Sequence, residues 1–121
     1  MRVGIVGSRR WKDREAVVVL VNELPADSVV ISGGCRGVDT WAATAARSRR
    51  LEVAEYLPDL PPSGSPIWAF TKAYHARNRQ IVENSDVIFA FVAPDRRGGT
   101  ENTIKHAREL GVRVEIIIEG R

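Results

Sequence analysis

The sequence predicts an α/β fold with one doubly wound, parallel sheet of about five strands and helices on both faces. Short apolar runs alternate with segments of helical periodicity along the whole chain. The runs are apolar throughout rather than every second residue, which is typical of strands covered on both faces. A length of 121 residues, with 44% hydrophobic and 27% charged residues, fits one domain over residues 1–121.

The first half of the chain predicts three strands and two helices. Residues 13–24 carry apolar side chains at three- and four-residue spacing, and Asp13 is a suitable N-cap for this helix. The alanine-rich residues 36–49 predict the second helix. The strands are expected at "RVGIVG" (2–7), "SVVIS" (28–32) and "LEVAEY" (51–56).

The second half begins with residues 57–66, which hold four of the six prolines and are expected to be irregular. A third helix is expected from Ile67 to about Asn84, and "DVIFAFV" predicts the fourth strand. The segment "TENTIKHAREL" predicts the fourth helix, for which Gly111 is a stop signal. The last strand is expected at "VRVEIII".

Helices between apolar strands imply parallel pairing with right-handed crossovers. In such a sheet, ligands bind beyond the carboxyl ends of the strands, near the point where strand order reverses. The informative loops are therefore "GSRRW" after the first strand, "GGCRGVD" after the second and "APDRRGGTEN" after the fourth.

Two of these loops are glycine turns that lead into a helix. Such turns let backbone N–H groups approach a phosphate, and the helix start adds a partial positive charge. The alternative is that the glycines only permit tight turns. The candidate ligand-binding residues of the three loops and of the third helix are Gly7, Ser8, Arg9, Trp11, Ser32, Gly33, Gly34, Arg36, Gly37, Asp39, Arg77, Asn78, Gly98, Gly99 and Thr100.

Several side chains among these candidates have two interpretations. Asp39 either accepts a hydrogen bond from a ribose or base, or only stabilises its helix N-terminus. Arg77 and Asn78 either clamp a phosphate or base, or belong to an ordinary helix surface. Trp11 is the candidate for stacking on a base, whereas Cys35 is expected to pack in the turn without catalysis.

Trp68, Phe70 and Tyr74 of the third helix could also stack on a base, although Trp11 is the better candidate. In a domain of this size, large aromatic side chains usually belong to the core, and neither histidine has a local Ser, Cys or Asp arrangement that suggests a triad. Core positions are expected for Trp41, Trp68 and Phe70, and structural or surface positions for His75 and His106.

Composition excludes several functional classes. One cysteine and two distant histidines give neither a disulfide nor a metal-ligand cluster, so no metal or other cofactor is expected. No apolar run reaches membrane-spanning length, and the start lacks a secretory pattern, so no membrane partner and a cytoplasmic location are expected. The net charge of +3 fits either a polyanionic partner or an ordinary solvated surface.

"GIVGSRR" is not a dinucleotide fingerprint, and no P-loop is present.

Taken together, "VGSRRWKD", "SGGCRGVDTWA", "RNRQIVENSDVIFAF" and "GGTENTIKHARELGVRV" resemble the SLOG superfamily. This Rossmann-like group includes DNA-processing protein A and the LOG-type phosphoribohydrolases, and the resemblance is nearest to its small YspA/YpsA-like branch. It implies a nucleotide pocket with Gly7 to Arg9 on one side, Gly33, Gly34 and Asp39 on another, and phosphate at Gly98 to Thr100.

The match to the phosphoribohydrolases is partial. Arg77 corresponds by spacing to their helical arginine, but Asn102 and Thr103 stand where their loop has two glutamates. The nearest carboxylate, Glu101, is one position away, which on a helix turns a side chain by about 100°.

Three functions follow as hypotheses. The first is a nucleotide-binding sensor or regulatory module. The second is a nucleoside 5′-monophosphate phosphoribohydrolase with Arg77 and Glu101 as its catalytic pair, against which the displaced carboxylate argues. The third is single-stranded DNA binding through the arginine clusters and Trp11. The resemblance also suggests a homodimer.

Overall fold

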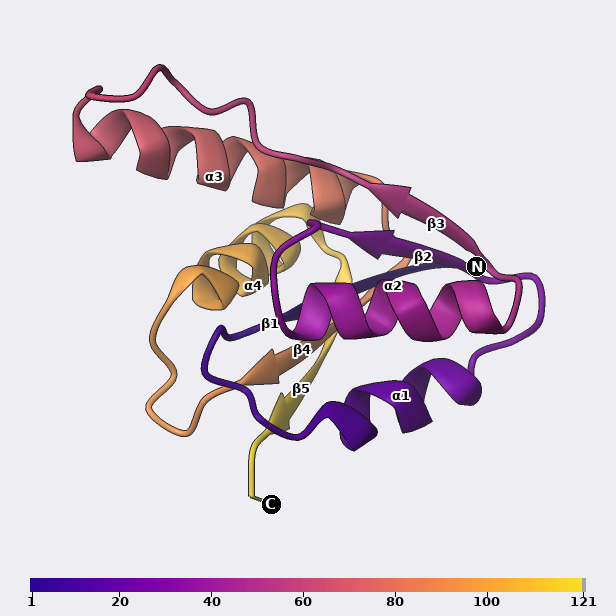
Figure 1. The fold of residues 1–121 in the computed structure, drawn as a ribbon. Helices are drawn as coiled ribbons and strands as arrows, with labels where there is room; N and C mark the ends of the chain where they lie inside the picture. Colours follow the sequence, from indigo (N-terminus) through magenta and orange to yellow (C-terminus); the bar gives the residue numbers. More distant parts are fainter. Residues whose placement is uncertain (121) are drawn as a thin grey trace.

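A computed structural model describes residues 1–120 and contains a five-stranded, all-parallel sheet with four helices (Figure 1). Strands and helices alternate strictly, as the sequence predicts. The elements are β1 (Arg2–Gly7), α1 (Arg14–Asn22), β2 (Val29–Ser32), α2 (Val38–Ser48), β3 (Glu52–Glu55), α3 (Ile67–Glu83), β4 (Val87–Val92), α4 (Gly99–Leu110) and β5 (Arg113–Ile118).

The strand order is β3-β2-β1-β4-β5, and every neighbouring pair is parallel. The chain first builds outward from β1 through β2 to β3, and then returns to the other side of β1 for β4 and β5. Strand order therefore reverses between β1 and β4. The register places Gly7, the last residue of β1, opposite Phe91 of β4.

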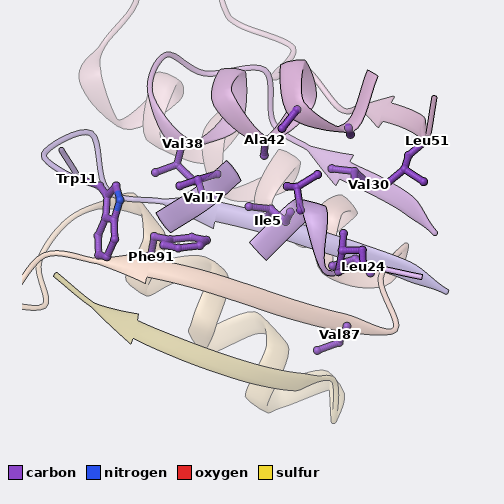
Figure 2. Close-up of a cluster of buried hydrophobic side chains, with 14 residues drawn as sticks. Ile5, Trp11, Val17, Leu24, Val30, Val38, Ala42, Leu51, Val87 and Phe91 are labelled. Carbon is purple, nitrogen blue, oxygen red and sulfur yellow. The ribbon is translucent and has the colours of Figure 1, made fainter. Parts of the chain in front are cut away.

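Alternate residues of the strands pack into two cores, one on each face of the sheet. Val3 and Ile5 of β1 lie with α1 and α2 in the first core (Figure 2), whereas Val6 lies with α3 and α4 in the second. Figure 1 shows α1 and α2 on one side of the sheet and α3 and α4 on the other. This confirms the predicted doubly wound, Rossmann-like architecture.

Local signals for the helix ends behave as the sequence predicts at two positions. The Asp13 carboxylate accepts a hydrogen bond from the Ala16 backbone N–H at 3.2 Å and so caps α1. Gly111 ends α4 in the left-handed conformation, with φ of 71°. Within residues 1–120, no helix combines the length and the apolar character needed to cross a lipid bilayer.

The expected positions of two tryptophans are wrong. Trp68 is not a core residue but is 67% exposed near the start of α3. Trp11, predicted to stack on a base, is only 5% exposed and packs edge-on against Phe91, with ring centroids 5.0 Å apart (Figure 2). Its indole N–H donates to the backbone carbonyl of Asp13 at 2.7 Å. Trp11 therefore belongs to the core and has no face free for a base.

Candidate functional site

A cleft of about 790 Å³ lies beyond the carboxyl ends of β1 and β4, where strand order reverses. The loops after β1, β2 and β4 and one side of α3 form its walls. Six of the eight buried polar or charged side chains among the described residues line it. Burying such groups costs free energy, so their concentration at one place makes this cleft the candidate functional site. These six are Ser8, Asp39, Arg77, Asn78, Thr100 and Thr103.

Asp39 lies in the first turn of α2, and its side chain reaches the cleft although the residue is only 7% exposed. Its carboxylate accepts a hydrogen bond from the Cys35 backbone N–H at 3.0 Å. Burial raises the pKa of Asp39 from 3.8 to about 6, against the opposing effects of the Cys35 N–H and the Arg77 guanidinium. Asp39 is therefore a buried acceptor that is charged at neutral pH at an energetic cost.

Arg77 comes from α3 and lines the cleft. Its guanidinium donates to the Gly33 carbonyl at 2.7 Å and to the Asn78 side-chain oxygen at 3.1 Å. It also lies 3.6 Å from the Cys35 sulfur and over the Tyr74 ring, 5.7 Å from its centroid. These contacts hold a positive charge rigidly at the position where the loop after β2 meets α3.

Arg77 and Asp39 both approach the backbone of Gly33 closely. A Cβ atom at Gly33 would lie 2.8 Å from an Arg77 guanidinium nitrogen and 2.9 Å from an Asp39 carboxylate oxygen. Both side chains are buried, so neither could move away without losing its hydrogen bonds. These two side chains therefore explain why position 33 is a glycine, which has no Cβ atom.

The loop after β4 offers backbone donors to the cleft. Gly98 precedes α4 with φ of 115°, a backbone conformation that residues other than glycine rarely adopt. No side chain caps this helix. The Glu101 N–H donates to the Gly98 carbonyl at 3.2 Å, whereas the N–H groups of Gly99 and Thr100 before it are open to a ligand or to water. Asn78 ties this loop to α3, since its amide donates to Asn102 Oδ1 at 3.1 Å and to the Gly99 carbonyl at 3.5 Å.

A bidentate ion pair connects the loops after β1 and β4. Arg10 donates to the two carboxylate oxygens of Asp95 at 2.8 and 2.6 Å, and both residues line the cleft. The Arg10 guanidinium lowers the pKa of Asp95. Arg9 and Arg97 also line the cleft with exposed side chains, which gives its rim a positive character.

Of the fifteen ligand-binding candidates, nine line the cleft. The others either support it or lie outside it. The nine are Gly7, Ser8, Arg9, Asp39, Arg77, Asn78, Gly98, Gly99 and Thr100.

Ser32, Gly34 and Gly37 shape the turn behind the cleft. The fully buried Ser32 hydroxyl accepts from the Gly34 N–H at 3.2 Å, and Gly37 precedes α2 with φ of 82°. Arg36 is exposed on this turn and is not among the cleft residues. None of these four residues lines the cleft, although Ser32, Gly34 and Gly37 support the turn beside it.

The catalytic pair of the hydrolase hypothesis is not assembled. Arg77 lines the cleft, but Glu101 does not. Instead, the Glu101 carboxylate accepts two hydrogen bonds from Arg96, at 2.8 and 2.9 Å. Asn102 takes the cleft position on this turn of α4, as expected when adjacent helical residues point about 100° apart.

Sequence reasoning missed two side chains of the α3 wall, Thr71 and His75, and named Tyr74 only as one of the aromatic residues that could stack on a base. All three line the cleft together with Arg77 and Asn78. Their three- and four-residue spacing places them on one helix face, and this was the available signal. Cys35, expected only to pack, also lines the cleft.

Comparison with known proteins agrees with this architecture. A relative from Mycobacterium phage D29, described as Gene 61 protein, is 37% identical over 118 residues, with 93% of each chain covered. The fold is also similar to that of DNA processing protein A from Streptococcus pneumoniae, with a TM-score of 0.77 and 20% identity. That comparison covers 95% of this chain but 49% of the other, so the chain spans about half the length of that protein.

The match to a protein family is located in the first half of the chain. The model of the YspA, cpYpsA-related SLOG family matches residues 1–61, which include β1, β2 and the glycine turn before α2. The 37% identical relative extends this similarity over nearly the whole chain. The chain therefore belongs to the YspA, cpYpsA-related SLOG family.

Proposed function

We propose that this protein binds a nucleotide or nucleotide derivative in the cleft and acts as a sensor or regulatory module. The observation that carries the proposal is the set of six buried polar side chains around one cleft beside an uncapped helix N-terminus. A volume of about 790 Å³ lies within the usual range for small-molecule sites, roughly 300–1,000 Å³.

The two ends of the cleft suit different parts of a nucleotide. Backbone N–H groups at Gly98 to Thr100, with the exposed Arg9 and Arg97, favour an anion such as phosphate. The Asp39 carboxylate, buried and aimed into the cleft, is an acceptor for the hydroxyl groups of a ribose. A ligand that supplies these donors would offset the cost of keeping Asp39 charged.

Direct binding measurements on the purified chain test this function. Mono- and dinucleotides and ADP-ribose derivatives are screened by thermal shift, and those that raise the melting temperature are titrated by calorimetry. At least one compound is expected to stabilise the protein, because a ligand that binds only the folded state shifts the unfolding equilibrium. No shift with any compound of the panel would refute nucleotide binding.

The substitution Gly99→Asp tests whether the α4 N-terminus holds the phosphate. A Cβ atom at Gly99 meets no other atom within 4 Å, so the variant is expected to fold, and a carboxylate suits the first turn of a helix. Next to a phosphate, however, the added charge costs about 1–4 kcal/mol at 4 Å, which weakens binding about fivefold or more.

The matched control is Ala26→Asp, which adds the same charge in the exposed turn between α1 and β2, at the amino-terminal end of the strands and so opposite the cleft. Equal loss of affinity in both variants would indicate a general charge effect and would contradict a phosphate site at α4.

The arginine-rich rim favours single-stranded DNA as a second candidate ligand. Arg9 and Arg97 at the cleft and Arg36 beside it are exposed cations at one edge of the sheet. This candidate has lost its proposed stacking residue, because Trp11 is in the core. A gel shift that weakens steeply with added salt would support it, and no shift at low salt would remove it.

A further inference from the structure

The exposed apolar side chains of this protein are concentrated beside α3. Of the seven large hydrophobic residues exposed among residues 1–120, four fall between residues 57 and 68. These four form what we call the α3 patch: Leu57, Leu60, Ile67 and Trp68, with exposed fractions of 66%, 46%, 84% and 67%. Scattered single apolar residues are ordinary on a surface, but a group of this size marks an interaction site.

A groove accompanies the α3 patch. The irregular segment after β3 runs back along α3 (Figure 1), and a depression of about 720 Å³ lies between the two. Its α3 side contains three alanines at helical spacing, Ala69, Ala73 and Ala76, beside Lys72, Arg77 and Gln80. The small alanine side chains leave room for a large side chain from outside.

The extent of the α3 patch agrees with one half of a protein interface. At about 200 Å² for a large apolar residue, its four members expose about 500 Å² of apolar surface. A stable interface buries about 800 Å² per partner, of which about 65% is apolar in homodimers. The two apolar areas are therefore nearly equal.

The charges at the groove suit a second copy of the same chain. Asp59 and Lys72 both line it, one on each wall. In an interface with two-fold symmetry, each residue that contacts a partner residue is contacted by it in return. Arg77 also lines the groove, but its guanidinium is hydrogen-bonded to Gly33 and Asn78. Asp59 and Lys72 can therefore pair twice across the axis, Asp59 of each copy with Lys72 of the other.

We propose that the α3 patch and its groove form a two-fold symmetric interface between copies of this chain, with Trp68 of each copy in the alanine-lined groove of the other. Helix α3 also carries Tyr74 and Arg77 of the cleft, so the second copy lies beside the candidate site. The proposal does not depend on which ligand the cleft binds.

Sedimentation velocity over a concentration series tests the interface. The wild-type chain is expected to form dimers, and Trp68→Glu to raise the dimer dissociation constant at least about 30-fold, as the loss of an interface hot spot does. Because Trp68 is exposed in the monomer, circular dichroism of the variant should be unchanged. Val19→Glu, at an apolar residue of α1 that is 46% exposed, is the matched control and should remain dimeric.

A charge exchange tests the register. Lys72→Asp alone should weaken the dimer by placing like charges together, and adding Asp59→Lys should restore it. The proposal is overturned if the wild-type chain stays monomeric up to its solubility limit. A monomer that inserts Trp68 into lipid vesicles would also overturn it. A dimer that survives Trp68→Glu also overturns it, because another surface must then hold the copies together.

Discussion

Replacing Asp39 by asparagine removes its charge while nearly preserving its shape. The asparagine oxygen can still accept the hydrogen bond from the Cys35 N–H. The substitution removes the desolvation free energy of an ionised carboxylate at a residue that is only 7% exposed. We therefore expect Asp39→Asn to be more stable than wild type at neutral pH, and at the same time to bind nucleotide more weakly.

The magnitude follows from the pKa of Asp39, which burial raises from 3.8 to about 6. Between these two values the folded state keeps a proton that the unfolded state has lost, so the contribution of Asp39 to stability falls as the pH rises. Above pH 6 the loss is constant at about 3 kcal/mol, from about 1.4 kcal/mol per pKa unit. Below pH 3.8 the carboxyl is protonated in both states and the loss vanishes.

Thermal and urea unfolding of both proteins at pH 8 and at pH 4 measure this difference. At pH 8, Asp39→Asn should melt about 10 °C higher, because 1 kcal/mol shifts the melting temperature of a domain of this size by about 3–5 °C. At pH 4 most of the gain should be gone. The exposed Asp27→Asn is the control and should show neither effect. An Asp39→Asn protein less stable than wild type at pH 8, or a gain that persists at pH 4, would refute the reasoning.

Three further substitutions have defined outcomes. Gly7→Ala should lower the free energy of unfolding by about 1–3 kcal/mol in urea titrations, because the new Cβ would overlap the Val38 side chain; wild-type stability would contradict this packing. Trp11→Phe should lose about 1–3 kcal/mol with the hydrogen bond to the Asp13 carbonyl, whereas weaker nucleotide binding at unchanged stability would restore its role in stacking. Glu101→Gln should cost less than about 1 kcal/mol, since its ion pair is partly exposed, and should leave nucleotide affinity unchanged in calorimetry. Chromatography that detected free base from wild type but none from Glu101→Gln would instead support the hydrolase.

Most of the fold could be predicted because its signals are local. Apolar runs, helical periodicity and the caps at Asp13 and Gly111 act within a few residues of the chain, and strict alternation of strands and helices leaves few topologies open. The three ligand-facing loops could be predicted for the same reason, since they follow directly from the strand positions.

The roles of individual side chains were less accessible, because burial is decided by contacts distant in sequence. Trp11 looks solvated beside Arg10 and Lys12, yet Phe91 and the first core cover it. Trp68 looks like a core residue within its helix, but no part of the sheet extends far enough to cover the start of α3.

By itself, the sequence determined the α/β class, the end of the strands at which the candidate site lies, and the glycine turns beside it. Tertiary structure alone decided which charges meet there. Arg77 reaches Gly33 and the neighbourhood of Asp39 across more than forty residues of chain, and Glu101 turns away to Arg96. The physical reason is that hydrogen bonding and desolvation depend on distance in space, whereas sequence patterns report only the neighbours along the chain.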